Sequence, residues 1–255
     1  MGQRFKKNYD IHCYDFDKNA KLKPTTLMNF LQDISTIHFE TQTKHLGPEV
    51  LNGLWVIVEW RVSMDEMPQE VTTLTVTTEP TYFRKFIAYR QYTIEDALGR
   101  ILGTAISKWA YIDLASRKQL NIPKVLNDVF EVAENADKPE KLTFIDLMDS
   151  EMQTMQRSSV YSDLDVNHHV NNVTYIRWAV DALGGDVLDH YRVRELQVAF
   201  KREVFEGEQV TVSSQKKVTT DGVITEHLIK DESGQLCVQI QIGWVPLNEA
   251  LRPLV

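Results

Sequence analysis

The sequence predicts an α+β protein built from two similar halves, and three observations support this prediction. Residues 13–35 align without a gap on residues 161–183, at a constant offset of 148 positions (165 − 17 = 148). In each half, a short strand and an Asp-x-Asn turn lead into an apolar stripe at helical spacing. Several segments rich in β-branched and aromatic residues follow each stripe, as in antiparallel strands. A helix followed by antiparallel strands, written twice, indicates two α+β domains of the same topology.

The two predicted helices cover residues 24–44 and 173–183. Pro24 suits the first turn of a helix, where its missing N–H needs no partner. Asn171 or Asn172 can cap the start of the second helix by accepting a hydrogen bond from a free backbone N–H. Each helix carries one apolar face, which must be buried against another element.

Four strands are predicted after each helix. In the first half they cover residues 54–62, 71–77, 86–93 and 101–112, and in the second half residues 195–204, 209–218, 223–229 and 236–245. A small antiparallel sheet wrapped around one long helix is the simplest way to bury the apolar face of that helix. The predicted organisation is a first domain over residues 1–122, a linker over 123–150 and a second domain over 151–255.

The composition is that of an ordinary globular protein, with 43% apolar and 25% charged residues in a chain of 255. The formal net charge of −8 argues against a nucleic-acid-binding protein. No apolar run is long enough to span a membrane, and the polar N-terminal residues lack the apolar core of a signal peptide. The two cysteines, Cys13 and Cys237, show no metal-type spacing, so no metal or other cofactor is expected. Together these features predict a cytoplasmic protein.

Three candidate site residues stand immediately before the second helix: Asp165, Asn167 and His169. They are two positions apart, so an extended backbone would point all three side chains at one face. The first N–H groups of the following helix are unpaired and carry a partial positive charge. An acid, an amide and an imidazole beside free backbone donors suit the polarisation and attack of a carbonyl group.

The Asp-x-Asn pattern also has a structural interpretation, because these side chains bond their own backbone two residues on. The first half keeps Asp17 and Asn19 at the matching positions but has Lys21 in place of His169. The aspartate and the asparagine therefore remain open to either interpretation. The imidazole occurs in one half only, which predicts one site per chain and a first half that has lost the chemistry.

Residues 163–178, Asp-Leu-Asp-Val-Asn-His-His-Val-Asn-Asn-Val-Thr-Tyr-Ile-Arg-Trp, resemble the most recognisable segment of the acyl-acyl carrier protein thioesterases of plant plastid and bacterial type. Residues 24–33 and 105–110, with the nearby Ser-Arg-Lys at 116–118, look like further segments of that family. The resemblance implies two tandem hotdog domains, each an antiparallel sheet wrapped around a long helix. It also implies that Asp165, Asn167 and His169 belong to the active site.

A further family segment, aromatic–basic–x–Glu–Cys, falls on residues 200–204 and implies that Glu203 is the acidic site residue. When residues 60–63 are set against 200–203, the counterpart of Glu203 is Ser63. The cysteine that plant members carry at the next position is replaced by Val204. This departure argues against a thiol nucleophile in this chain.

The function that the resemblance implies is hydrolysis of the thioester of a fatty acyl-acyl carrier protein, releasing free fatty acid in fatty acid biosynthesis. Water attack with Glu203 or Asp165 as the base is the expected chemistry, and direct attack by the carboxylate to give a transient anhydride stays open as an alternative. The first domain is expected to bind the acyl tail. The expected partner is an acyl carrier protein that bears the fatty acyl chain. An acyl-CoA thioesterase and a non-catalytic acyl-thioester-binding protein stay open as alternatives. Tandem domains are compatible with a monomer or a homodimer.

Overall fold

The computed structural model describes residues 2–68, 72–147 and 152–247. The chain forms two compact units, each discontinuous in sequence. Unit 1 comprises Met1–Ile11, Asn29–Val62 and Val71–Leu142, and unit 2 comprises His12–Met28, Ser63–Glu70 and Thr143–Val255. The sequence analysis instead divides the chain into continuous segments, with boundaries at residues 122 and 151, and this division stays a prediction.

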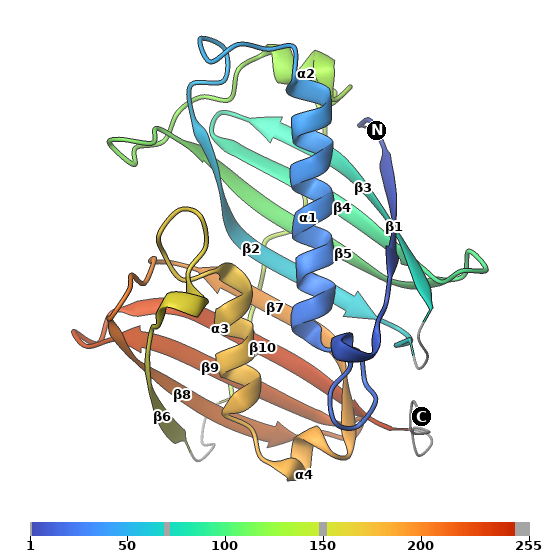
Figure 1. The fold of residues 1–255 in the computed structure, drawn as a ribbon, viewed down its shortest axis with the longest axis vertical. Helices are drawn as coiled ribbons and strands as arrows, with labels where there is room; N and C mark the ends of the chain where they lie inside the picture. The colour runs from blue at the N-terminus through green and yellow to red at the C-terminus, as the bar shows by residue number, and fades with distance from the viewer. Residues whose placement is uncertain (1, 69–71, 148–151, 248–255) are drawn as a thin grey trace. The chain divides into compact units, whose positions relative to one another are not determined.

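Unit 1 contains a five-stranded sheet with one long helix across a face (Figure 1). It comprises β1 (Phe5–Asp10), most of α1 (Pro24–Thr43) and of β2 (Leu54–Met64), β3 (Thr73–Arg84), β4 (Ile87–Glu95), β5 (Ile101–Ile112) and α2 (Val125–Val129). The strand order is β1-β3-β4-β5-β2, and the β1–β3, β3–β4 and β4–β5 pairs are antiparallel.

The core of unit 1 lies between α1 and the inner face of this sheet. Leu31 and Ile34 on α1 are fully buried, and so is Val76 on β3. Burial of each such side chain contributes roughly 1.5–3 kcal/mol. Tyr92 of β4 places its hydroxyl 2.7 Å from the Ser35 hydroxyl of the helix, so the same face also contains a satisfied polar contact.

Unit 2 repeats this topology with a shorter helix (Figure 1). Its elements are β6 (Gln153–Ser158), α3 (Asn172–Asp181), α4 (Gly185–Leu188), β7 (Tyr191–Phe200), β8 (Gln209–Val218), β9 (Val223–Asp231) and β10 (Leu236–Pro246). The strand order is β7-β10-β9-β8-β6, with every neighbouring pair antiparallel. The predicted α+β class and the repeated helix-and-sheet topology are confirmed.

The structure corrects two details of the predicted elements. The helix of the second half has 10 residues against 20 for α1, so the expected long helix is present only in unit 1. The chain leaves α3 at Ala182 and starts the separate helix α4 after Gly184, whose extended backbone (φ −83°, ψ 172°) interrupts the helix. A short helix, α2, also forms inside the predicted linker and leads into the fully buried Phe130. Among the described residues, no helix is both long enough and apolar enough to cross a membrane.

Candidate active site

The Asp-x-Asn segment of the second half is a tight turn. The Asp165 N–H donates to the His169 carbonyl at 3.0 Å, and the His168 N–H donates back to the Asp165 carbonyl at 3.0 Å. His168 has a φ of +64°, a left-handed conformation that an extended strand does not contain. The prediction that an extended backbone points Asp165, Asn167 and His169 at one face is therefore wrong.

The turn nevertheless places His169 between two carboxylates. His169 Nε2 lies 3.3 Å from Glu203 Oε1, and His169 Nδ1 lies 3.7 Å from Asp165 Oδ1. The first distance is within reach of a hydrogen bond, whereas the second is close enough only for a charge interaction. The side chains of His169 and Asp165 are 14% and 16% exposed, and that of Glu203 is 33% exposed, so solvent reaches the glutamate best.

Asp165 and Asn167 also serve the turn itself. The Asn167 N–H donates to Asp165 Oδ1 at 2.8 Å, which is the local bond that the structural interpretation of Asp-x-Asn requires. The exposed Asn167 side chain places its amide nitrogen 3.5 Å from Asp165 Oδ2. The structure thus brings Asp165, His169 and Glu203 together, and places Asn167 at the exposed side of Asp165.

The start of α3 follows the predicted capping pattern. Asn171 is the N-cap, and its Oδ1 accepts a hydrogen bond from the Val173 N–H at 2.9 Å. The Thr174 N–H donates to the Asn171 carbonyl at 2.9 Å. Within the described part of the chain, the Asn172 N–H has no hydrogen-bond acceptor. This group is therefore the donor at the helix start that is left for a ligand.

Glu203 reaches His169 because β7 ends earlier than the apolar pattern predicts. The predicted strand runs to Val204, but β7 ends at Phe200, where the N–H groups of Lys201 and Arg202 both donate to the Cys237 carbonyl. The chain then passes beside the turn, and the Val170 N–H donates to the Val204 carbonyl at 2.8 Å. This bond connects the residue after His169 with the residue after Glu203.

One residue that contacts this arrangement was missed by the sequence reasoning. Tyr175 lies on the buried face of α3, and its hydroxyl accepts a hydrogen bond from the Val204 N–H at 3.1 Å. A signal was available, because the matching position of the first half (175 − 148 = 27) is Leu27, which has no hydroxyl.

Neither cysteine is placed to act as a nucleophile. Val204, at the position of the plant cysteine, is fully buried. Cys237 is also fully buried, and burial raises the pKa of its thiol. Cys13 is exposed and precedes the loop of the first half. The geometry therefore favours oxygen chemistry through a carboxylate and an imidazole over thiol chemistry.

The matching loop of the first half has the same backbone but different contacts. The Asn19 N–H donates to Asp17 Oδ1 at 2.9 Å, as in the second half. Lys21, at the position of His169, is 6% exposed, and its ammonium group donates to the carbonyls of Leu188 and Tyr191. The Lys21 ammonium group thus forms its hydrogen bonds with backbone carbonyls of unit 2.

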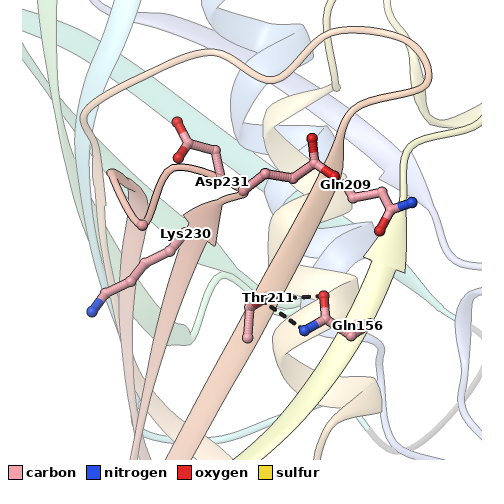
Figure 2. A pocket seen from close by; sticks show the side chains of 7 residues that line it. Gln156, Gln209, Thr211, Lys230 and Asp231 are labelled. Atoms are coloured by element: carbon pink, nitrogen blue, oxygen red, sulfur yellow. Dashed lines mark hydrogen bonds between the residues drawn. The ribbon is translucent and has the colours of Figure 1, made fainter.

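A polar hollow opens elsewhere on unit 2, at strands β6, β8 and β9 (Figure 2). Its labelled side chains are Gln156, Gln209, Thr211, Lys230 and Asp231. Gln156 and Thr211 hydrogen-bond each other at 2.9 Å, and Asp231 pairs with Arg202. The described lining contains none of the four predicted site residues. No cluster of three metal-ligating side chains occurs in residues 2–68, 72–147 and 152–247.

Comparison with known proteins places both halves in one family. The family described as the acyl-ACP thioesterase N-terminal domain matches residues 2–131, and the one described as the acyl-ACP thioesterase C-terminal domain matches residues 148–246. Together these matches include the repeated loops of both halves, with Asp165, His169 and Glu203 in the second.

Among curated proteins, the chain is 27% identical to the chloroplastic acyl-acyl carrier protein hydrolase FATB2 of Cuphea viscosissima. That alignment covers 100% of this chain and 66% of the Cuphea protein, so the chain spans just under two thirds of its relative.

Two solved structures show the same fold. An acyl-ACP thioesterase of Bacteroides thetaiotaomicron is 22% identical, with a TM-score of 0.79 over 94% of this chain and 97% of that one. The 12:0-ACP thioesterase of Umbellularia californica is 18% identical, with a TM-score of 0.79 over 96% and 94% of the two chains. The expected tandem hotdog fold is confirmed by these likenesses, and the family matches in both halves show that the chain belongs to the acyl-ACP thioesterases.

Proposed function

We propose that this protein hydrolyses the thioester of a fatty acyl chain carried on acyl carrier protein and releases free fatty acid. The observation that carries the proposal is the 3.3 Å approach of His169 Nε2 to the Glu203 carboxylate. An imidazole and a solvent-accessible carboxylate at this distance can exchange a proton, which thioester hydrolysis requires twice. Family membership and the names of the relatives supply the substrate class.

Glu203 is the base in this scheme. Water attacks the thioester carbon while Glu203 takes a proton from the water, and a tetrahedral oxyanion forms. The carbon–sulfur bond then breaks, and the leaving sulfur takes a proton from His169. Glu203 returns its proton to His169, so the fatty acid and the carrier thiol leave with the enzyme in its starting state.

Asp165 has two roles in this scheme: it orients His169 and it stabilises the turn. Its Oδ1 accepts from the Asn167 N–H and lies 3.7 Å from His169 Nδ1, so it orients the imidazole that protonates the leaving sulfur. Glu203 is twice as exposed as Asp165, which favours it as the group that meets water. The Asn172 N–H at the start of α3 supports the oxyanion as a backbone donor.

The test is fatty acid release from palmitoyl-acyl carrier protein by the wild-type chain and by Glu203→Gln. Glutamine keeps the shape of the side chain but cannot act as a base, so kcat should fall by about 10²- to 10⁴-fold. Equal turnover by the two proteins would contradict the assignment. Palmitoyl-CoA in a parallel assay separates the acyl-CoA thioesterase, and stoichiometric binding without turnover by wild type identifies an acyl-thioester-binding protein.

The first half is proposed to hold the acyl tail, since it keeps the helix-and-sheet scaffold without the imidazole or the glutamate. Ala105 is buried on the face of β5 that looks toward α1, and its neighbour Thr104 is exposed on the other face. Ala105→Phe adds volume under the helix, so the ratio of kcat/KM values for long and short acyl chains should fall. Thr104→Phe is the matched control and should leave that ratio unchanged. An unchanged ratio in Ala105→Phe contradicts this assignment.

A further inference from the structure

The peptide group of Val204 connects the two catalytic side chains of the proposed function. Its carbonyl accepts from the Val170 N–H at 2.8 Å, next to His169, and its N–H donates to the Tyr175 hydroxyl at 3.1 Å, next to Glu203. Val204 is fully buried, so water cannot replace either bond at this peptide. The position of the Glu203 backbone therefore depends on the Tyr175 hydroxyl.

The Tyr175 side chain is itself held firmly. It is 2% exposed, and its ring meets Trp178 edge-on at 5.5 Å and Phe200 at 6.1 Å between ring centres. Phe200 is the last residue of β7, so the ring contacts the strand from which the Glu203 segment departs. Burial raises the pKa of Tyr175, which keeps the hydroxyl neutral and able to accept at any ordinary assay pH.

The two halves of the chain support a functional interpretation of this contact. Among the many positions that differ between the halves are His169 against Lys21, Glu203 against Ser63 and Tyr175 against Leu27. Leu27 is buried at 3% exposure, so the first half fills the same helix position with an apolar side chain. The hydroxyl occurs only in the half that has a glutamate to position.

We propose that Tyr175 is a positioning residue of the active site, which fixes Glu203 against His169 through the Val204 N–H. This inference rests on the proposed hydrolysis. Without the hydroxyl the Val204 N–H is buried and unpaired, and the segment around it must shift to find another partner. A shift of this segment changes the His169–Glu203 distance, which the proton transfers depend on.

Tyr111 in unit 1 provides a matched control. Its hydroxyl accepts from the Gly53 N–H at 2.7 Å, and the residue is 1% exposed. Tyr175→Phe and Tyr111→Phe therefore remove the same kind of bond from two equally buried tyrosines, although the Gly53 donor is half-buried and the Val204 donor is fully buried. Both should lower the midpoint of thermal unfolding by roughly 2–8 °C, with the larger shift in Tyr175→Phe.

Only Tyr175→Phe should alter catalysis of palmitoyl-acyl carrier protein hydrolysis. We expect its kcat to fall roughly 10- to 100-fold with KM within twofold of wild type, and its pH–rate profile to change shape. Tyr111→Phe should retain the wild-type kcat and profile. A kcat of Tyr175→Phe within twofold of wild type, or an equal loss in both variants, overturns the proposal.

Hydrogen exchange at the Val204 amide tests the contact without any turnover. Slow exchange in the wild-type chain that becomes faster in Tyr175→Phe supports the positioning contact, and equal exchange in both overturns it. Failure of the proposed function is distinguishable, because it would appear as an inactive wild-type protein whether or not the amide exchange changes.

Discussion

The Asp17–Lys21 and Asp165–His169 loops share a backbone and differ in what their fifth residue does. In both loops the first aspartate accepts the N–H two residues on, at 2.9 and 2.8 Å, and the fourth residue has a positive φ. Lys21 then turns inward to two backbone carbonyls, whereas His169 lies between two carboxylates. The comparison separates the turn, which both loops form, from the chemistry, which we propose for the second loop alone.

The difference also explains why a turn shared by both halves of the chain is weak evidence for an active site. The Asp-x-Asn pair is local, and its bonds form within four residues in either loop. The proposed site requires in addition Glu203, which follows the end of β7, and the Tyr175 hydroxyl of α3, which we propose positions it. A half that keeps the turn but lacks these long-range partners remains folded without the means to move a proton.

The largest effect is expected when His169 of the second loop is replaced by lysine, the residue at the matching position of the first loop. His169→Lys should leave the turn intact, because the turn bonds use the backbone of residue 169. Hydrolysis of acyl-acyl carrier protein should fall by about 10²- to 10⁴-fold, since an ammonium group between two carboxylates cannot pass protons as imidazole does. Measured kcat close to wild type would show that the loop difference is not catalytic.

A second test distinguishes the pH dependence of activity at His169 from the pH dependence of stability at a core histidine of the same unit, His227. His227 is fully buried between Ser214 and Thr225, and burial lowers its pKa to about 3. The unfolded chain has a His pKa near 6.5. Protonation of His227 therefore favours the unfolded state. The free energy of unfolding should be at its maximum above pH 6.5 and should fall by about 1.4 kcal/mol per pH unit as the pH drops toward 3.

The measurement is denaturant unfolding at pH 7 and pH 4.5 for wild type and His227→Gln. Wild type should lose roughly 2–3 kcal/mol more than the variant between these two pH values. Parallel losses would mean that His227 is not the group that titrates. Activity profiles recorded above pH 6.5 then reflect the site and not the stability of the core.

Lys21 tests the structural side of the comparison. Lys21→Met keeps the length of the side chain but removes the ammonium donor from the Tyr191 carbonyl, whereas the Leu188 carbonyl keeps the Asn19 amide as a donor. We expect the free energy of unfolding to fall by about 1–3 kcal/mol, the cost of an unpaired buried polar group. The kcat for acyl-acyl carrier protein should stay within twofold of wild type. A large loss of kcat at unchanged stability would assign Lys21 to the chemistry.

Much of this site follows from short-range sequence patterns, and the remainder depends on tertiary contacts. The cap at Asn171 and the turn at Asp165 were predictable because each bond spans two residues. The approach of Glu203 to His169 came from the family resemblance, since residues 34 positions apart meet only when β7 ends at Phe200 (203 − 169 = 34). An apolar pattern that continues to Val204 conceals that end, because Val204 is buried without being in the strand.

The smallest expected effect comes from the aspartate that both loops share. Asp17→Ala removes the acceptor of two turn N–H groups and Asp165→Ala removes the acceptor of one, so each should lower the free energy of unfolding by about 1 kcal/mol per lost bond. Only Asp165→Ala removes a carboxylate beside His169, so only this variant should lower kcat. Asp165→Asn retains an acceptor for the turn without the charge, and it should recover stability but not activity. If Asp165→Asn recovers both, the carboxylate serves the turn alone, and Glu203 and His169 carry the proton transfers without it.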